Sequence, residues 1–111
     1  MLRTFVFILI FSGAVARFSA IAQTAQAAIS GTVRDPDGRA VPEATIEVRQ
    51  LQTGWTRRTQ TGSAGTYSIT ELPIGSYLVS VSHPGFGRSQ ANVELLVGQE
   101  RTLNFELLLA G

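Results

Sequence analysis

The feature that most constrains this chain is a regular alternation of apolar and polar residues, which begins at Ile29 and continues almost to the C-terminus. This period of two is typical of β-strands that bury one face, since successive side chains of a strand point to opposite sides of the sheet. Turn residues interrupt the pattern at short intervals, and no segment of this region has the 3.6-residue period of a helix. Strands are expected at residues 29–34, 44–49, 66–70, 76–82, 91–95 and 102–107.

A seventh strand is expected at residues 55–61, which have β-propensity but no apolar face. Such a strand suits the edge of a sheet, because its two arginines discourage pairing with another chain. Short strands that each have one apolar face can bury those faces when two sheets pack against each other. The sequence therefore predicts an all-β fold, a seven-strand antiparallel β-sandwich, over residues 28–111.

The N-terminal segment has the pattern of a secretion signal. Arg3 supplies a positive start, and an apolar run follows over residues 4–16. This run is shorter than the roughly 20 apolar residues that cross a bilayer as a helix. Small-x-small cleavage patterns end at Ala22 and at Ala27, and the sequence does not rank these two sites. We therefore expect residues 1–27 to be a cleaved signal peptide and the mature chain to be exported.

The residue inventory excludes several kinds of chemistry. The sequence contains no cysteine, one histidine (His83) and nine basic residues, all of them arginine. The lack of cysteine rules out disulfides, a thiolate nucleophile and a lipidated cysteine. After signal removal, seven arginines face eight acidic residues, a net charge of about −1, so no nucleic-acid partner is expected. We expect no catalytic residue, no metal and no cofactor, and we interpret His83 as a turn residue.

A series of motifs occurs in an order that is typical of one known family. They are Gly-Thr-Val-Arg-Asp-Pro-Asp-Gly at residues 31–38, Val-Pro-Glu-Ala-Thr-Ile at 41–46, Gly-Thr-Tyr-Ser-Ile at 65–69, Leu-Pro-Ile-Gly-Ser-Tyr at 72–77 and His-Pro-Gly-Phe at 83–86. The series resembles the carboxypeptidase regulatory-like domains over residues 29–108. Gly62 departs from the Asp or Asn that the family often has at this position. The resemblance implies a transthyretin-like (prealbumin-like) sandwich, also called a carbohydrate-binding-like fold.

The resemblance also implies a setting for the domain. Such domains occur beside metallocarboxypeptidase domains, in surface proteins and at the N-terminus of TonB-dependent outer-membrane receptors. A signal peptide that leads directly into the domain is most similar to the Oar-like receptors of this last group. Those receptors continue into a plug and a barrel, which residues 28–111 cannot build, because each barrel strand takes about 9–11 residues.

From the missing reactive residues together with this resemblance, we expect a non-catalytic accessory module, either a fragment of such a receptor or a free-standing domain. Its location is expected to be the periplasm or the outer membrane of a Gram-negative cell. Its partner is expected to be a protein or the remainder of the receptor, while the ligand and the oligomeric state stay open.

Enzymes of related folds need side chains that this chain lacks. Hydroxyisourate hydrolases of the transthyretin-like type use several histidines and end in Tyr-Arg-Gly-Ser, whereas this chain ends in Leu-Leu-Leu-Ala-Gly. Intradiol dioxygenases hold iron through two tyrosines and two histidines, and His83 is the single histidine here. Tyr67 and Tyr77 fall at inward positions of their strands, so we expect them to be core aromatics whose hydroxyls bond to loops.

One group of residues, Trp55 with Arg57 and Arg58, is a candidate binding site. An aromatic face stacks on sugars, and arginine donates hydrogen bonds to hydroxyls or carboxylates. Alternatively, Trp55 covers one end of the core beside a solvated edge strand. A carbohydrate-binding module that uses Trp55 and the adjacent edge strand is therefore the second functional hypothesis, with a glycan as the partner.

Overall fold

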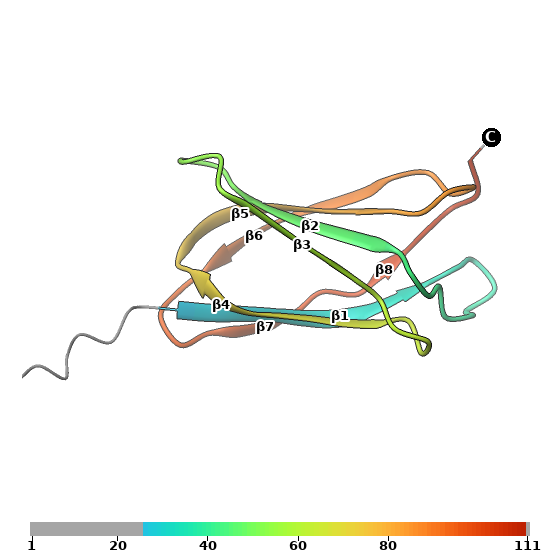
Figure 1. Cartoon of the computed structure of the whole chain (residues 1–111), viewed down its shortest axis with the longest axis horizontal. Coiled ribbons are helices and arrows are strands. Elements are labelled where there is room, and N and C mark those ends of the chain that lie inside the picture. The colour runs from blue at the N-terminus through green and yellow to red at the C-terminus, as the bar shows by residue number, and fades with distance from the viewer. Residues whose placement is uncertain (1–25, 111) are drawn as a thin grey trace, which may run out of the picture.

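The chain folds into two β-sheets that pack face to face (Figure 1). The computed structural model describes residues 26–110. The strands are β1 (Gln26–Arg34), β2 (Thr45–Gln50), β3 (Thr56–Gln60), β4 (Thr66–Pro73), β5 (Gly75–Ser82), β6 (Ser89–Leu95), β7 (Glu100–Thr102) and β8 (Phe105–Glu106). Within this part of the chain, no helix is long and apolar enough to cross a membrane. The predicted all-β sandwich is confirmed, whereas the predicted signal peptide lies outside the described residues except for its last two positions.

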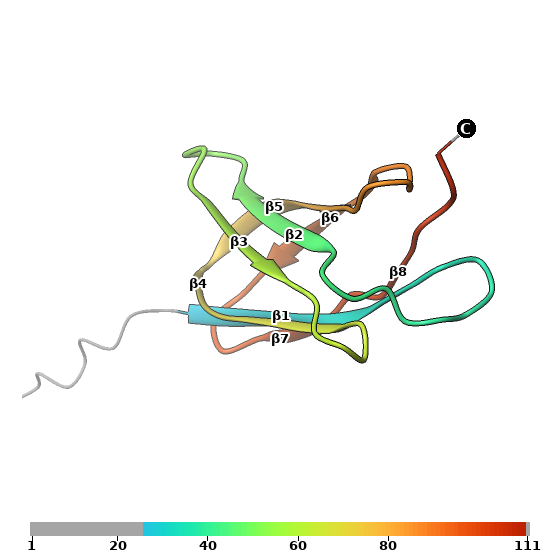
Figure 2. The ribbon, with the colours of Figure 1, turned by 45° about the vertical axis from the view of Figure 1, so that its right-hand side comes forward.

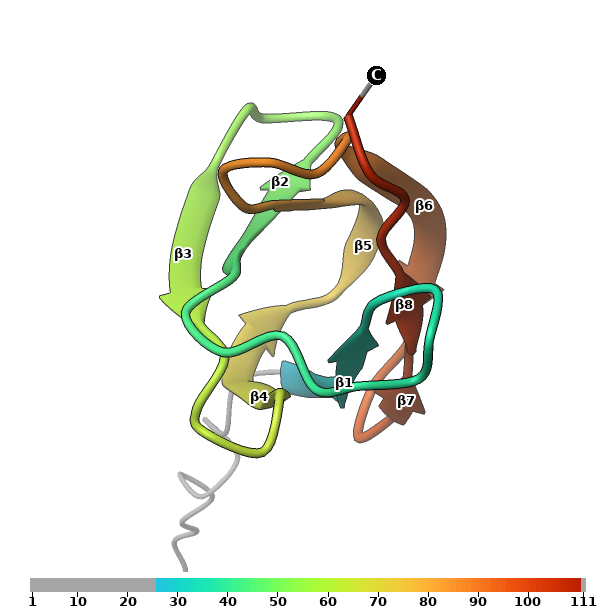
Figure 3. The ribbon, with the colours of Figure 1, turned by 90° about the vertical axis from the view of Figure 1, so that its right-hand side faces the viewer.

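The two sheets differ in the direction of their strands. One sheet has the order β3-β2-β5-β6, and all of its strand pairs are antiparallel. The other is centred on β1, which pairs with β4 along one edge and with β7 and β8 along the other. Figure 3 shows β4, β1 and β7 as the lower layer and the other sheet above it. The chain passes between the layers at the tight turn from β4 to β5, where Gly75 has a φ of 142°.

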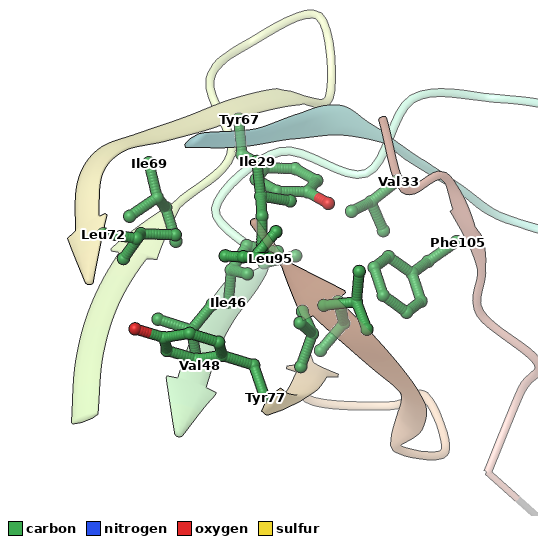
Figure 4. Close-up of a cluster of buried hydrophobic side chains, with 14 of the residues drawn as sticks. Ile29, Val33, Ile46, Val48, Tyr67, Ile69, Leu72, Tyr77, Leu95 and Phe105 are labelled. Atoms are coloured by element: carbon green, nitrogen blue, oxygen red, sulfur yellow. The ribbon is translucent and has the colours of Figure 1, made fainter. Parts of the chain in front are cut away.

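The alternation in the sequence becomes a closed apolar core between the sheets (Figure 4). Ile46 and Val48 of β2 point inward from one sheet, and Ile69 and Leu72 of β4 point inward from the other. Each such side chain contributes about 1.5–3 kcal/mol when it is fully buried. The large side chains that are almost completely buried are Tyr77, Ile29, Ile46, Leu72, Leu95, Leu107, Val33, Val48, Val79 and Val81. This core holds the sandwich together without a disulfide.

The sequence predicted an entirely antiparallel sandwich of seven strands, and this prediction is wrong for the C-terminal segment. The segment predicted as one strand at residues 102–107 is divided into β7 and β8, and both run parallel to β1. At the break between them, Asn104 Oδ1 accepts hydrogen bonds from the backbone N–H of Thr32 (2.9 Å) and from its hydroxyl (3.2 Å). The side chain of Asn104 therefore replaces a backbone carbonyl in the ladder. Alternation could not predict the strand direction, because the pattern is the same when read from either end.

The first strand begins at Gln26, whereas the sequence predicted a start at Ile29. Gln26 pairs with Pro73 and Ala27 with Leu72, so the extension adds to the antiparallel ladder with β4. The carbonyl of Gln26 accepts a hydrogen bond from the N–H of Gly98 (2.9 Å), and Ala27 is buried in the core. Both residues therefore belong to the sandwich.

Candidate functional site

The candidate residues Arg57 and Arg58 lie in β3, on one edge of the β3-β2-β5-β6 sheet, and Trp55 directly precedes this strand. The edge position predicted for this strand is confirmed. A tight turn connects β2 to β3. In it the N–H of Gln50 donates to the carbonyl of Trp55 (2.7 Å), and Gly54 has a φ of 78°. Because side chains alternate along a strand, Arg57 and Arg58 point to opposite faces of the sheet. The structure thus divides the three residues into an inner pair and an outer arginine.

Trp55 is partly buried and packs against the core. Its ring meets that of Tyr77 edge to face, with the centroids 6.4 Å apart and the planes at 83°. The guanidinium carbon of Arg57 lies 5.3 Å from the centroid of the Trp55 ring, which is a cation–π distance. One face of the indole is therefore occupied by the side chain of Arg57, two residues further along the chain, and the ring helps to cover the end of the core.

Arg57 connects the two sheets at their shared edge. Its guanidinium donates hydrogen bonds to the carbonyl oxygens of Thr70 (2.6 Å) and Glu71 (3.0 Å) on β4. Figure 2 and Figure 3 show β3 and β4 on the same side of the sandwich, one in each layer. Glu71 has a φ of 56°, a left-handed conformation that is uncommon for a non-glycine residue. The donors of Arg57 are thus used inside the fold, on a bent segment of β4.

Arg58 lies on the outer face, where its Nε is 3.0 Å from Oε2 of Glu47. The Arg58 side chain is 72% exposed, whereas that of Glu47 is 30% exposed. An ion pair that is this open to water contributes little to stability. Arg58 therefore does not share a surface with Trp55, and the three candidate residues do not form one contiguous binding site.

The two tyrosines have the core positions predicted for them. The hydroxyl of Tyr67 donates to the carbonyl of Leu103 and that of Tyr77 to the carbonyl of Pro73, each at 2.6 Å. Burial raises the pKa of Tyr67 to about 12. Burial also raises the pKa of Tyr77, and the positive charge of Arg57 partly offsets this rise. Both phenols are protonated groups with structural hydrogen bonds.

His83 lies in the loop between β5 and β6. Its Nδ1 is 2.9 Å from the carbonyl oxygen of Pro84, and its ring meets that of Phe86 edge to face at 5.6 Å. Its predicted position in a turn is confirmed. Among residues 26–110, no group of three or more His, Asp or Glu side chains is arranged to hold a metal ion.

The structure also gives roles to residues that the sequence analysis did not single out. Thr61 is buried, and its hydroxyl donates to the carbonyl of Val41 (2.6 Å) while accepting from the N–H of Ala44 (2.9 Å). Arg88, just before β6, lines a polar hollow together with Glu47, Arg58 and three hydroxyl residues. Neither role has a local sequence signal, because each depends on strands that are distant along the chain.

Comparison with protein families gives one match, to the carboxypeptidase regulatory-like domain, over residues 28–108. The chain belongs to this family. No curated protein matches the sequence. The family match confirms the resemblance seen in the motifs, and the matched range covers the sandwich from the third residue of β1 to just beyond β8.

Solved structures similar to this regulatory-like domain show the same fold in very different proteins. The Bacillus anthracis TIE protein matches with a TM-score of 0.65 and 19% identity, over 78% of this chain and 17% of that protein. A mutant of Acinetobacter radioresistens catechol 1,2-dioxygenase matches with a TM-score of 0.66 and 14% identity, over 84% of this chain and 55% of the enzyme. The dioxygenase domain of a dioxygenase–carbohydrate-binding fusion from Streptomyces sp. SirexAA-E matches with a TM-score of 0.63 and 14% identity, over 84% and 86%.

These similarities concern the fold alone, since all three identities are low. The chain spans about half the length of the catechol dioxygenase and less than a fifth of the TIE protein. The two tyrosines of this domain donate their hydroxyls to backbone carbonyls, as described above, and they come from opposite sheets.

Proposed function

We propose that this chain is a non-catalytic, exported interaction module, and that it is the N-terminal periplasmic domain, or a fragment containing it, of a TonB-dependent outer-membrane receptor. One observation supports the non-catalytic role above all. The chemically versatile side chains of the candidate site and the core donate to backbone carbonyls within the sandwich: Arg57 to β4, Tyr67 to Leu103 and Tyr77 to Pro73. Membership of the regulatory-like family supports the role of an accessory domain.

Cell fractionation tests the exported location. The chain with a C-terminal epitope tag is expressed in a Gram-negative host, and protease is added to intact cells and to spheroplasts. The proposal expects a shortened chain that becomes protease-accessible only after the outer membrane is opened. A control variant, Leu9→Arg, places a charge in the apolar run of the predicted signal and should retain the full-length chain in the cytoplasm. A wild-type chain that also stays there at full length contradicts export.

The receptor context has a separate test in the coding sequence. The proposal expects a plug and a barrel to be encoded in the same reading frame after the codon for Gly111. If the frame instead closes there, cross-linking in cells should connect the domain to an outer-membrane receptor. Absence of both results counts against the receptor context while leaving the interaction module untouched.

A second candidate function is glycan binding at Trp55, which is supported by the partial exposure of this residue. The contact with Arg57 on one face and the edge contact with Tyr77 both reduce the surface that is available to a sugar. Retention on immobilised polysaccharides tests this candidate, with Trp55→Phe as the matched variant. If Trp55 is mainly structural, wild type and Trp55→Phe are retained equally. A specific loss of retention in a variant that is still folded supports the glycan site instead.

A further inference from the structure

The outward face of the β3-β2-β5-β6 sheet carries a group of polar side chains that the core and the Trp55 region do not use. The strand register places these residues in two adjacent rows across the sheet. The first row runs from β3 to β6 through Arg58, Glu47, Ser80 and Gln90, and the second runs through Gln60, Thr45 and Ser82 towards Arg88, which directly precedes β6.

A hollow of about 210 Å³ lies over these rows. Its lining is Thr45, Glu47, Arg58, Ser80, Ser82 and Arg88. The hollow follows from the lengths of the side chains. The short hydroxyl residues stand on the two inner strands, β2 and β5, whereas the long arginines stand at the two sides, on β3 and before β6. Since neighbouring strands are about 4.8 Å apart, the two arginines flank a floor that is two strands wide.

The two arginines retain hydrogen-bonding capacity that the fold does not use. Arg58 contacts Glu47 through Nε, and no described residue accepts a hydrogen bond from its two terminal nitrogens. Arg88 is exposed, and its side chain has neither an ion pair nor a hydrogen bond to any residue in the range 26–110. On the floor, Ser80 is buried and its hydroxyl accepts a hydrogen bond from Gln90 Nε2 (3.1 Å), which fixes its orientation.

We propose that this hollow binds an acidic sugar, a uronic acid, through its carboxylate and its hydroxyls. Guanidinium groups bind carboxylates with strong, charge-assisted hydrogen bonds. The hydroxyls of Thr45 and Ser82 can donate to or accept from sugar hydroxyls, and the carboxylate of Glu47 accepts from them.

Two features of the hollow select this chemistry over others. The hollow is lined by two arginines and one glutamate, a net charge of +1, so a singly charged carboxylate balances it, whereas the second charge of a phosphate is left unmatched beside Glu47. No aromatic residue lines the hollow, so a neutral sugar has no ring on which to stack. The carboxylate is therefore the group on which binding depends. This site is on the outer face of the sheet, and it uses Arg58 but neither Trp55 nor Arg57.

The test is a titration of the purified ¹⁵N-labelled chain with D-galacturonic acid, followed by NMR. The expected result is a saturable shift of the amide signals of Thr45, Ser80, Ser82 and Arg88. D-galactose, which has the same ring without the carboxylate, is expected to give no saturable shift. Inorganic phosphate is expected to bind at least tenfold more weakly than galacturonic acid.

Variants of the arginines connect binding to the hollow. Arg58→Gln and Arg88→Gln are each expected to weaken galacturonic acid binding about tenfold or more, the loss typical of one hydrogen bond to a charged group. Arg49→Gln is the matched control: Arg49 is exposed on the same face of β2 but does not line the hollow. It should bind as wild type does. All three residues are on the surface, and the dispersion of the amide spectrum verifies that each variant is folded.

Several results would overturn the proposal: no saturable shift with galacturonic acid, equal binding of galactose, stronger binding of phosphate, or shifts centred on Trp55. Undiminished binding by Arg88→Gln would also overturn it. Titration with an oligogalacturonate distinguishes two possible ligands that contain a uronic acid, a polysaccharide and a free sugar acid. Tighter binding of the oligomer than of the monomer identifies an acidic polysaccharide as the source, and equal binding identifies the free sugar acid; both results support the site.

Discussion

Gly31 provides the sharpest test of the way the C-terminal strand is held against β1. A Cβ atom added to Gly31 would lie 1.8 Å from the carbonyl oxygen of Leu103 and 2.7 Å from its carbonyl carbon. Ordinary van der Waals contact begins at 3.4 Å, so the Leu103 backbone would have to move by about 1.6 Å, the difference between 3.4 and 1.8 Å. A flexible side chain could move aside at little cost, but here the obstacle is the backbone of a paired strand.

The cost of Gly31→Ala follows from what this movement disturbs. The N–H of Leu103 donates to the carbonyl of Ser30 (2.8 Å), and its carbonyl accepts from the hydroxyl of Tyr67 (2.6 Å). Overpacking of this kind costs about 1–3 kcal/mol, and each hydrogen bond that is lost adds about 0.5–1.5 kcal/mol. If both hydrogen bonds are lost, we expect Gly31→Ala to lower the free energy of unfolding by about 2–6 kcal/mol. For a domain of this size, each kcal/mol lowers Tm by about 4–8 °C.

Urea unfolding followed by the fluorescence of Trp55, the single tryptophan, measures the effect. Gly62→Ala is the matched control, because a Cβ at Gly62 meets no atom within 4 Å and Gly62 has no positive φ. This control should change the free energy of unfolding by less than about 1 kcal/mol, because alanine fits here without strain and also restricts the unfolded chain. If Gly31→Ala is as stable as Gly62→Ala, the close approach of Leu103 to β1 is refuted.

Three further predictions follow from the contacts of the domain. Arg57→Gln should lower the free energy of unfolding by about 1–3 kcal/mol, because two carbonyls of β4 lose their donor. Arg58→Gln should lower it by less than about 1 kcal/mol, because its ion pair with Glu47 is exposed. Equal effects of the two variants in urea unfolding would contradict the assignment of Arg57 to the fold and of Arg58 to the surface. In the folded state the pKa of Tyr67 is about 12, whereas that of an exposed tyrosine is 10.0. The contribution of Tyr67 to stability should therefore be full below pH 10 and decline between about pH 10 and 12. Tyr67→Phe should make this decline shallower in thermal melts, and an unchanged slope would rule out Tyr67 as its source. Because Ala27 is buried within β1, we expect the signal peptide to be cleaved after Ala22. The intact mass of the mature chain tests this, and a mass that corresponds to residues 28–111 would show cleavage after Ala27 instead.

The strands could be predicted because the alternation that indicates them involves only residues that are close together in the sequence. Ile46 and Val48 alternate with polar neighbours in a way that requires one buried face, whatever the rest of the chain does. The same holds for the burial of Tyr67 and Tyr77, whose inward positions follow from the alternation on either side of them. The family resemblance also depended on local motifs, and the family match over residues 28–108 confirms it.

The candidate site was predicted less well, since proximity in sequence is not proximity on a surface. Trp55, Arg57 and Arg58 are almost consecutive, yet alternation sends Arg57 inward to β4 and Arg58 outward to Glu47. The sequence shows that Arg57 and Arg58 point to opposite faces of the strand, but it does not show which carbonyls Arg57 contacts. Those carbonyls belong to the opposite sheet.

By itself, the sequence determined that this protein is an all-β sandwich with apolar inner faces, and its composition shows that cysteine and lysine are absent and that histidine occurs once. Only the tertiary structure decided that β7 and β8 run parallel to β1, that Gly31 must lack a side chain beside Leu103, and that Arg58 and Arg88 flank one hollow. The physical reason is the range of the interactions. Alternation and turn chemistry act between neighbours in the chain, whereas strand direction, close backbone approach and surface hollows arise between segments brought together by the packing of the core.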